Sequence, residues 1–164
     1  MLNKNVQNAI NDQIKAELYS SYIYLAMSAH FEAENLPGFA QWTRMQAEEE
    51  MEHTMKLFDY VNERGGRVVL QAIDQPIIEY GTPLETFEMI LAHEQKVTDL
   101  IHKLYALALH EDDYATQVML HWFIDEQVEE ESNSGMMVEQ LKMVGDSKAG
   151  ILHLDRHAGK RAGE

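Results

Sequence analysis

The chain has 164 residues, and its 28 acidic and 13 basic side chains give a formal net charge of −15. This length predicts a single domain, 1–164, that can bury a core. The negative charge disfavours binding to nucleic acid or to an anionic membrane and favours cations. The absence of cysteine excludes disulfides, thiolate metal ligands and iron–sulfur clusters. No apolar run approaches the roughly 18 residues of a membrane span, and the first residues lack a signal-peptide core, so we expect a cytoplasmic protein.

Apolar residues recur at steps of three and four along most of the chain, which predicts long helices with one buried face. Pro37-Gly38 and Gly65-Gly66 separate the first elements. A third helix starts at Pro83, where Thr82 and Glu85 form a capping box. Asp112-Asp113 is expected to cap the fourth helix. The expected helices are about 5–34, 39–64, 83–110, 114–144 and a short fifth, 147–157, followed by a polar tail, 158–164.

The segment between the second and third helices, 67–82, decides how the helices are connected in space. Extended at about 3.3 Å per residue it reaches on the order of 50 Å, whereas the second helix is roughly 40 Å long. It can therefore return along the whole bundle and leave these two helices parallel. A two-stranded flap is the alternative, but it leaves Val68-Val69-Leu70 without a partner. We expect an all-α four-helix bundle with one long crossover between helices two and three and a short fifth C-terminal helix.

Five polar residues occupy inward positions where apolar ones are expected: Glu17, Glu50, His53, Glu94 and Glu130. With short turns in each antiparallel pair, all four long helices bring their carboxylate to about mid-bundle. A carboxylate in a core is costly unless its charge is compensated. Carboxylate and imidazole suit iron and manganese well, and zinc acceptably, so we predict a pair of metal ions. The alternative is a set of solvated glutamates whose helical phase is misjudged.

The spacing also predicts how the ligands are shared. Glu50 is the natural bridging ligand, because His53, one helical turn away, binds only one ion. Glu17 would complete the first ion's ligands, and Glu94 with Glu130 would hold the second.

Further polar residues lie near the same level. Tyr24, one heptad from Glu17, is expected to hydrogen-bond a ligand carboxylate or to donate one electron. Gln127 is expected to steady bound oxygen or water near the first ion. A second acidic set predicts a third, weaker metal site, because like charges this dense cost stability unless a cation binds; the alternative is a wet helix surface. Its members are Glu49, Glu126, Glu129 and Glu130.

These residues resemble those of the bacterial non-haem ferritins over the full length of the chain. The matching positions are Glu17, Glu50-x-x-His53, Glu94 and Glu126-Gln127-x-x-Glu130. The resemblance implies a ferroxidase that binds Fe(II) at paired sites and oxidises it with O₂ or H₂O₂. It also implies storage of the ferric product inside a homo-oligomeric shell of 24 subunits.

By position, the resemblance assigns each residue a place. The first site takes Glu17, Glu50 and His53, and the second takes Glu50, Glu94 and Glu130. The third takes Glu49, Glu126, Glu129 and Glu130, while Tyr24 and Trp122 match aromatic residues near the centre.

Two features narrow the branch of the family. Bacterioferritins and rubrerythrin-like proteins carry a second Glu-x-x-His, and here that place reads Gln127-x-x-Glu130. Met51 stands where bacterioferritins put their haem-ligating methionine, but a lone methionine on a helix is usually packing, so we predict no haem. The small DNA-protecting ferritins lack the fifth helix and the Glu-x-x-His.

Further hypotheses concern the histidines and the acidic turn between helices three and four. His153 and His157 have a spacing that can bind metal, or they are ordinary polar positions. The acidic turn between helices three and four either steers Fe(II) inward or caps helix four, and both roles can hold; it contains Glu111, Asp112 and Asp113. The spacing of three other histidines does not indicate a metal-binding partner for them: His93, His102 and His121.

Two alternatives to iron storage stay open at this level. A free-standing di-iron oxidase or peroxidase would need an open substrate pocket and would leave the fifth helix unexplained. A metal-free helical scaffold would give no reason for carboxylates at matched depths. Assembly size separates storage from the oxidase, and metal content isolates the scaffold.

Overall fold

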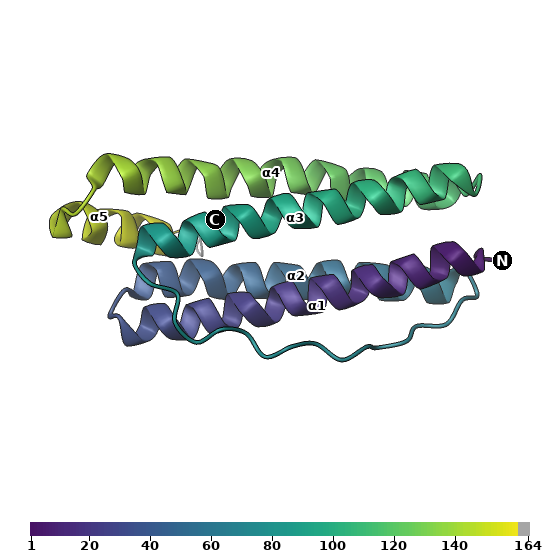
Figure 1. The fold of residues 1–164 in the computed structure, drawn as a ribbon, viewed down its shortest axis with the longest axis horizontal. Coiled ribbons are helices and arrows are strands. Elements are labelled where there is room, and N and C mark those ends of the chain that lie inside the picture. Colours follow the sequence, from purple (N-terminus) through teal and green to yellow (C-terminus); the bar gives the residue numbers. More distant parts are fainter. Residues whose placement is uncertain (161–164) are drawn as a thin grey trace.

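The computed structural model describes residues 1–160, which form five α-helices. They are α1 Lys4–Ala33, α2 Pro37–Glu63, α3 Pro83–His110, α4 Tyr114–Val144 and α5 Lys148–Ala158. α1 packs along α2 and α3 along α4, and the two pairs together form a four-helix bundle (Figure 1). The predicted all-α bundle is confirmed, with every helix end within two residues of its expected position. Helix α5 takes in Ala158, the first residue of the expected tail, and 161–164 lie outside the described residues.

The crossover between α2 and α3 is also confirmed. Residues 64–82 contain neither helix nor strand and run back along the length of the bundle beside α1 (Figure 1). The side-chain amide of Asn11 on α1 binds the start of this segment through two hydrogen bonds. Its Nδ2 donates to the Arg67 carbonyl at 3.1 Å, and its Oδ1 accepts from the Val69 amide at 3.0 Å. This path leaves α2 and α3 parallel.

The predicted N-caps are found at the start of α3 and at the start of α4. Thr82 Oγ1 accepts from the Glu85 amide at 3.3 Å, and Glu85 Oε2 accepts from the Thr82 amide at 2.7 Å, which completes the capping box at α3. Asp113 Oδ1 accepts from the Thr116 amide at 3.1 Å and caps α4. Local sequence thus fixes where α3 and α4 begin.

The apolar core is divided into two clusters. One contains Tyr24, Phe39 and Phe87, and the other contains Ile14 and Phe123. Along each long helix a buried acidic residue lies between the stretches that feed these clusters, so a polar layer crosses the middle of the bundle. Within the described part of the chain, no helix is long and apolar enough to cross a membrane.

Helix α5 is fastened to the start of α2. The N-cap of α2, Leu36, supplies no side-chain hydrogen bond, and the buried Asp155 of α5 takes that role, since its Oδ1 accepts from the Phe39 amide at 2.8 Å. The approach requires glycine at position 38, because a Cβ on Gly38 would lie 1.7 Å from the Asp155 carbonyl oxygen. The short helix is therefore part of the fold and not a loose appendage.

Candidate metal centre

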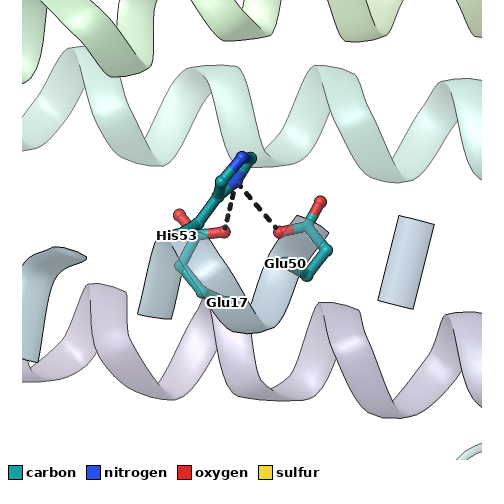
Figure 2. A group of neighbouring side chains, drawn as sticks. All are labelled: Glu17, Glu50 and His53. Carbon is teal, nitrogen blue, oxygen red and sulfur yellow. Dashed lines mark ion pairs between the residues drawn. The ribbon is translucent and has the colours of Figure 1, made fainter. Parts of the chain in front are cut away.

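Three predicted ligands converge in the polar layer. Glu17 comes from α1, and Glu50 and His53 come from successive turns of α2; their ligand atoms all lie within 4.8 Å of one another. His53 Nδ1 lies 3.9 Å from Glu17 Oε2 and 3.5 Å from Glu50 Oε2. Figure 2 shows both carboxylates turned toward the imidazole. All three side chains are buried, so water does not compensate their charge.

The carboxylate oxygens in this group are short of hydrogen-bond donors. Glu17 Oε2 and both oxygens of Glu50 are buried, and within residues 1–160 they have no hydrogen-bond partner. A buried acceptor without a donor costs free energy comparable to a lost hydrogen bond. Oxygen and imidazole donors converging without competing hydrogen bonds fit a divalent cation. Glu50 in particular has both oxygens free of hydrogen bonds, as a ligand shared between two ions requires.

The pKa values of the buried carboxyls also favour a cation at this position. Burial, and next the neighbouring Glu50, raise the pKa of Glu17 well above its ordinary value. Burial, and next Glu94, raise the pKa of Glu50 in the same direction. The pKa of Glu94 is also raised by burial, although hydrogen bonds from Tyr24 and Gln127 oppose the shift. The raised pKa values mean that these carboxyls keep their protons to higher pH than ordinary carboxyls, and a bound cation would displace those protons.

Glu94 on α3 and Glu130 on α4 are buried as predicted, and each has a donor beside it. Tyr24 Oη donates a short hydrogen bond to Glu94 Oε1, which agrees with the predicted contact to a ligand carboxylate. Gln46 Nε2 donates to Glu130 Oε2 at 2.8 Å. Neither carboxylate belongs to a group of three close ligand atoms within the described residues, so their role at a second ion stays a prediction.

Gln127 is buried and hydrogen-bonds to α3. Its Nε2 donates to Glu94 Oε2 at 3.2 Å and to the Glu94 carbonyl at 3.1 Å, and its expected role near the first ion stays a prediction. It also contacts Thr98 Oγ1 at 3.2 Å. The predicted helix phase is confirmed, because Gln127 is buried and its amide reaches the carbonyl and the carboxylate of Glu94 on α3.

The sequence does not indicate a role for two further glutamines of this layer. Buried Gln13 donates from Nε2 to Glu17 Oε1 at 2.8 Å and leaves Oε2 turned toward His53. Gln46, on the inward stripe of α2, holds Glu130 as described above. The available signal was spacing, since Gln13 stands four residues before Glu17 on the same helix face.

Two tryptophans frame the centre. The Trp122 ring meets the His53 ring edge-on with centroids 5.1 Å apart, and Lys56 Nζ lies 3.9 Å from the Trp122 ring centroid. Trp42 meets Tyr24 edge-on with centroids 6.5 Å apart. The expected position of Tyr24 and Trp122 near the centre is therefore confirmed, whereas Trp42 was missed.

The third acidic set is spread over different degrees of exposure. Glu130 is buried, Glu49 and Glu126 are half-buried, and Glu129 is exposed. In the described residues these side chains do not form a compact group of three ligand atoms. The third site therefore stays a prediction.

The acidic turn between α3 and α4 is largely used for structure. Arg64 donates to Asp113 from Nη1 at 3.0 Å and from Nη2 at 3.2 Å. Asn3 Nδ2 and Asn5 Nδ2 donate to the two oxygens of Glu111 at 2.7 and 2.8 Å. The third carboxylate of this turn belongs to Asp112, which is exposed and has a φ of 53°. Asp112 is therefore the residue of the turn that is available to steer cations. The capping role is thus confirmed, and steering remains a hypothesis.

The other predicted positions are placed as follows. His153 and His157 are exposed on α5, and so is His102 on α3. The packing role of Met51 is not seen within the chain, since its side chain is 42% exposed. His93 has a partner that the sequence did not indicate: its Nε2 lies 2.8 Å from Ser20 Oγ. Burial lowers the pKa of His93 to about 4.

A four-helix bundle with one long crossover and with glutamate and Glu-x-x-His ligands projecting inward defines the ferritin-like class of di-iron carboxylate proteins. Comparison with known proteins agrees. The ferritin-like domain family model matches residues 7–144. The bacterial non-heme ferritin of Bacteroides fragilis strain 638R is 44% identical, over 98% of this chain and 100% of the relative. That of Staphylococcus aureus strain USA300 is 38% identical, over 98% and 97%.

Solved structures show the same likeness. An open-pore ferritin from the hyperthermophilic archaeon Archaeoglobus fulgidus superposes with a TM-score of 0.96 and 43% identity, covering 97% of this chain and 98% of that one. The chain therefore belongs to the ferritin family. It is an iron-storage protein with ferroxidase activity, and its buried Glu17–Glu50–His53 group is consistent with a ferroxidase site.

Proposed function

We propose that the polar layer is a di-iron ferroxidase centre. The first Fe(II) is held by Glu17, Glu50 and His53, and the second by Glu50, Glu94 and Glu130. The observation that carries the proposal is the convergence of three buried ligand groups, three of whose carboxylate oxygens lack hydrogen-bond partners among the described residues. Two divalent ions would neutralise the four carboxylates, and they would replace protons at Glu17, Glu50 and Glu94, whose pKa values burial raises.

The chemistry is a two-electron transfer from the substrate iron. Each Fe(II) gives one electron, and together they reduce O₂ to H₂O₂, or H₂O₂ to two waters, with protons taken up by the product. Hard carboxylate ligands stabilise the ferric product more than the ferrous substrate, which favours oxidation. Tyr24 orients Glu94 through its hydroxyl and is placed to supply a further electron.

Storage requires an assembly, and we propose a homo-oligomeric shell of 24 chains in the cytoplasm. Apolar side chains that are exposed in the single chain gather along α1 and the crossover segment, and they would be covered by another copy: Tyr22, Leu25, Ile77 and Ile78. Glu49, Glu126, Glu129 and Glu130 form the proposed third iron site. The archaeal relative is described as an open-pore ferritin, and a closed form of it has been engineered, so native mass spectrometry is the measurement of shell size for this chain.

The test of the centre is oxidation kinetics. Fe(II) is added without oxygen at two equivalents per chain, air is admitted, and the near-ultraviolet absorbance of ferric species is followed. We expect fast oxidation in the wild type and its loss in the double variant Glu50→Ala, His53→Ala. Equal slow traces in both proteins would mean that the buried carboxylates do not oxidise iron.

A further inference from the structure

A cavity of about 230 Å³ lies between α1, the crossover segment and α3. Exposed charged side chains of both signs stand around it, two aspartates and two lysines, and less polar side chains form its walls. The lining residues used below are Tyr19, Ile73, His93, Lys96 and Leu100. None of the lining residues belongs to the five proposed iron ligands, so the cavity is not part of the site described above.

His93 lines this cavity and also contacts two buried residues of α1. Its Nε2 lies 2.8 Å from the hydroxyl oxygen of the buried Ser20 on α1, which ties α3 to α1 at this point. Its ring also meets the ring of buried Tyr24 edge-on, with centroids 6.3 Å apart and an interplanar angle of 88°. Tyr24 in turn donates to Glu94. The His93 ring therefore links the cavity to Tyr24 and, through Tyr24, to Glu94 at the proposed second iron position.

The lining selects a class of molecule. Two lysines and two aspartates carry no net charge, so the cavity does not concentrate Fe(II) as the acidic layer does. Its volume is several times the roughly 30 Å³ that a water occupies in the liquid. The Tyr19 hydroxyl and the His93 ring can donate and accept hydrogen bonds. These properties suit a small, neutral molecule that also donates and accepts hydrogen bonds.

We propose that this cavity is the entry for hydrogen peroxide, with the His93–Ser20 pair as its inner wall. The inference rests on the proposed di-iron centre and adds the route by which one oxidant reaches it. At the centre the peroxide O–O bond breaks, each of two Fe(II) supplies one electron, two protons are taken up, and two waters leave. Dioxygen is apolar and needs no hydrogen-bonding entry, so its use does not depend on this cavity.

The experiment fills the cavity without touching the iron ligands. Ile73→Trp fills it from the crossover segment, and Leu70→Trp is the matched control, since Leu70 is an exposed residue of the same segment that does not line the cavity. Oxidation is measured against H₂O₂ concentration without O₂, and separately against O₂. We expect Ile73→Trp to raise the apparent KM for H₂O₂ roughly tenfold with the maximal rate unchanged. Leu70→Trp should match the wild type.

A second pair of variants guards against misfolding and against failure of the centre itself. Leu100→Trp fills the cavity from α3 and should reproduce the effect of Ile73→Trp, whereas His93→Ala removes the inner wall and should lower the KM for H₂O₂. Anaerobic Fe(II) binding must stay at the wild-type stoichiometry in every variant. If wild-type protein binds no Fe(II), the di-iron centre fails and not the entry route. Unchanged KM for H₂O₂ in both filled variants, or an equal rise for O₂, would overturn the proposal.

Discussion

At the scale of single residues, the four buried carboxylates of the polar layer differ in the hydrogen bonds that they accept. Glu17, Glu94 and Glu130 each accept a hydrogen bond from a neutral donor, whereas within residues 1–160 Glu50 has no hydrogen-bond donor on either oxygen. A neutral donor orients a carboxylate without competing for charge, so the ligand is positioned before the ion arrives. This difference agrees with the proposal that Glu50 is the shared ligand, while Gln13, Gln46 and Gln127 orient the other three carboxylates.

Gln13 offers a direct test of that support. Gln13→Leu removes the donor to Glu17 Oε1 at similar volume. Because outer partners of metal ligands tune affinity, we expect Fe(II) binding to weaken by roughly tenfold. Anaerobic calorimetric titration measures it, with Gln41→Leu, an exposed position on α2, as the control. Equal affinity in both variants would show that the hydrogen bond does not position Glu17.

The raised carboxyl pKa values predict how the metal-free protein responds to pH. The folded state binds protons on Glu17, Glu50 and Glu94 that the unfolded state has already lost above the ordinary pKa of 4.5. Stability falls with pH wherever the folded state holds more protons. The unfolding free energy of chelated protein should therefore decline as pH rises above about 4.5 toward the raised pKa values.

Urea denaturation at a series of pH values, with chelator present, measures this decline. Glu17→Gln removes one of the titrating carboxyls and should make the pH dependence shallower. Addition of Fe(II) without oxygen should reverse the trend, because ligands must be deprotonated to bind metal. A metal-free protein that gains stability over the same pH range would contradict the account.

At the scale of elements, the helices and the crossover could be predicted because their signals are local. Periodicity places Glu17, Glu50, Glu94 and Glu130 on inward faces, and short turns set their depth, so the polar layer follows from the sequence alone. Contacts between distant elements could not be predicted, because a side chain's partner depends on how the helices pack. The Asp155 cap on α2 is of this kind, as are the contacts of Gln46 and His93 described above.

The docking of α5 gives the prediction at this scale. Asp155→Ala leaves the Phe39 amide without its acceptor, and loss of a helix cap typically costs about 1 kcal/mol. Asp155→Asn keeps an acceptor oxygen and should lose less. Denaturant midpoints of the metal-free chain measure both, with exposed Asp146→Ala at the α4–α5 turn as the control. If Asp155→Ala and Asp146→Ala unfold at the same denaturant concentration, Asp155 does not fasten α5.

At the scale of the whole molecule, the proposed iron ligands occupy positions at the centre of the bundle that would otherwise be filled by apolar packing. The acidic layer interrupts two apolar clusters that would otherwise be continuous. A buried carboxylate without donors is less favourable than an apolar side chain of similar size. Function and stability of the metal-free chain are therefore opposed at Glu50.

Glu50→Leu tests that opposition. We expect the metal-free variant to be more stable than the wild type by about 1–3 kcal/mol, because an unsatisfied buried group is removed, and to lose iron oxidation. Chelated protein is compared by urea denaturation, with exposed Glu52→Leu on the same helix as the control. A destabilised Glu50→Leu protein would show that the carboxylate is satisfied in a way that the buried oxygens do not indicate.

The central claim is that Glu50 bridges two iron ions in the middle of the bundle. Anomalous diffraction at the iron edge, from crystals soaked anaerobically with Fe(II), tests it most directly. We expect two peaks in each chain, one beside Glu17 and His53 and one beside Glu94 and Glu130, with the Glu50 carboxylate between them. A single peak beside His53, or no peak in the polar layer, would contradict the di-iron centre.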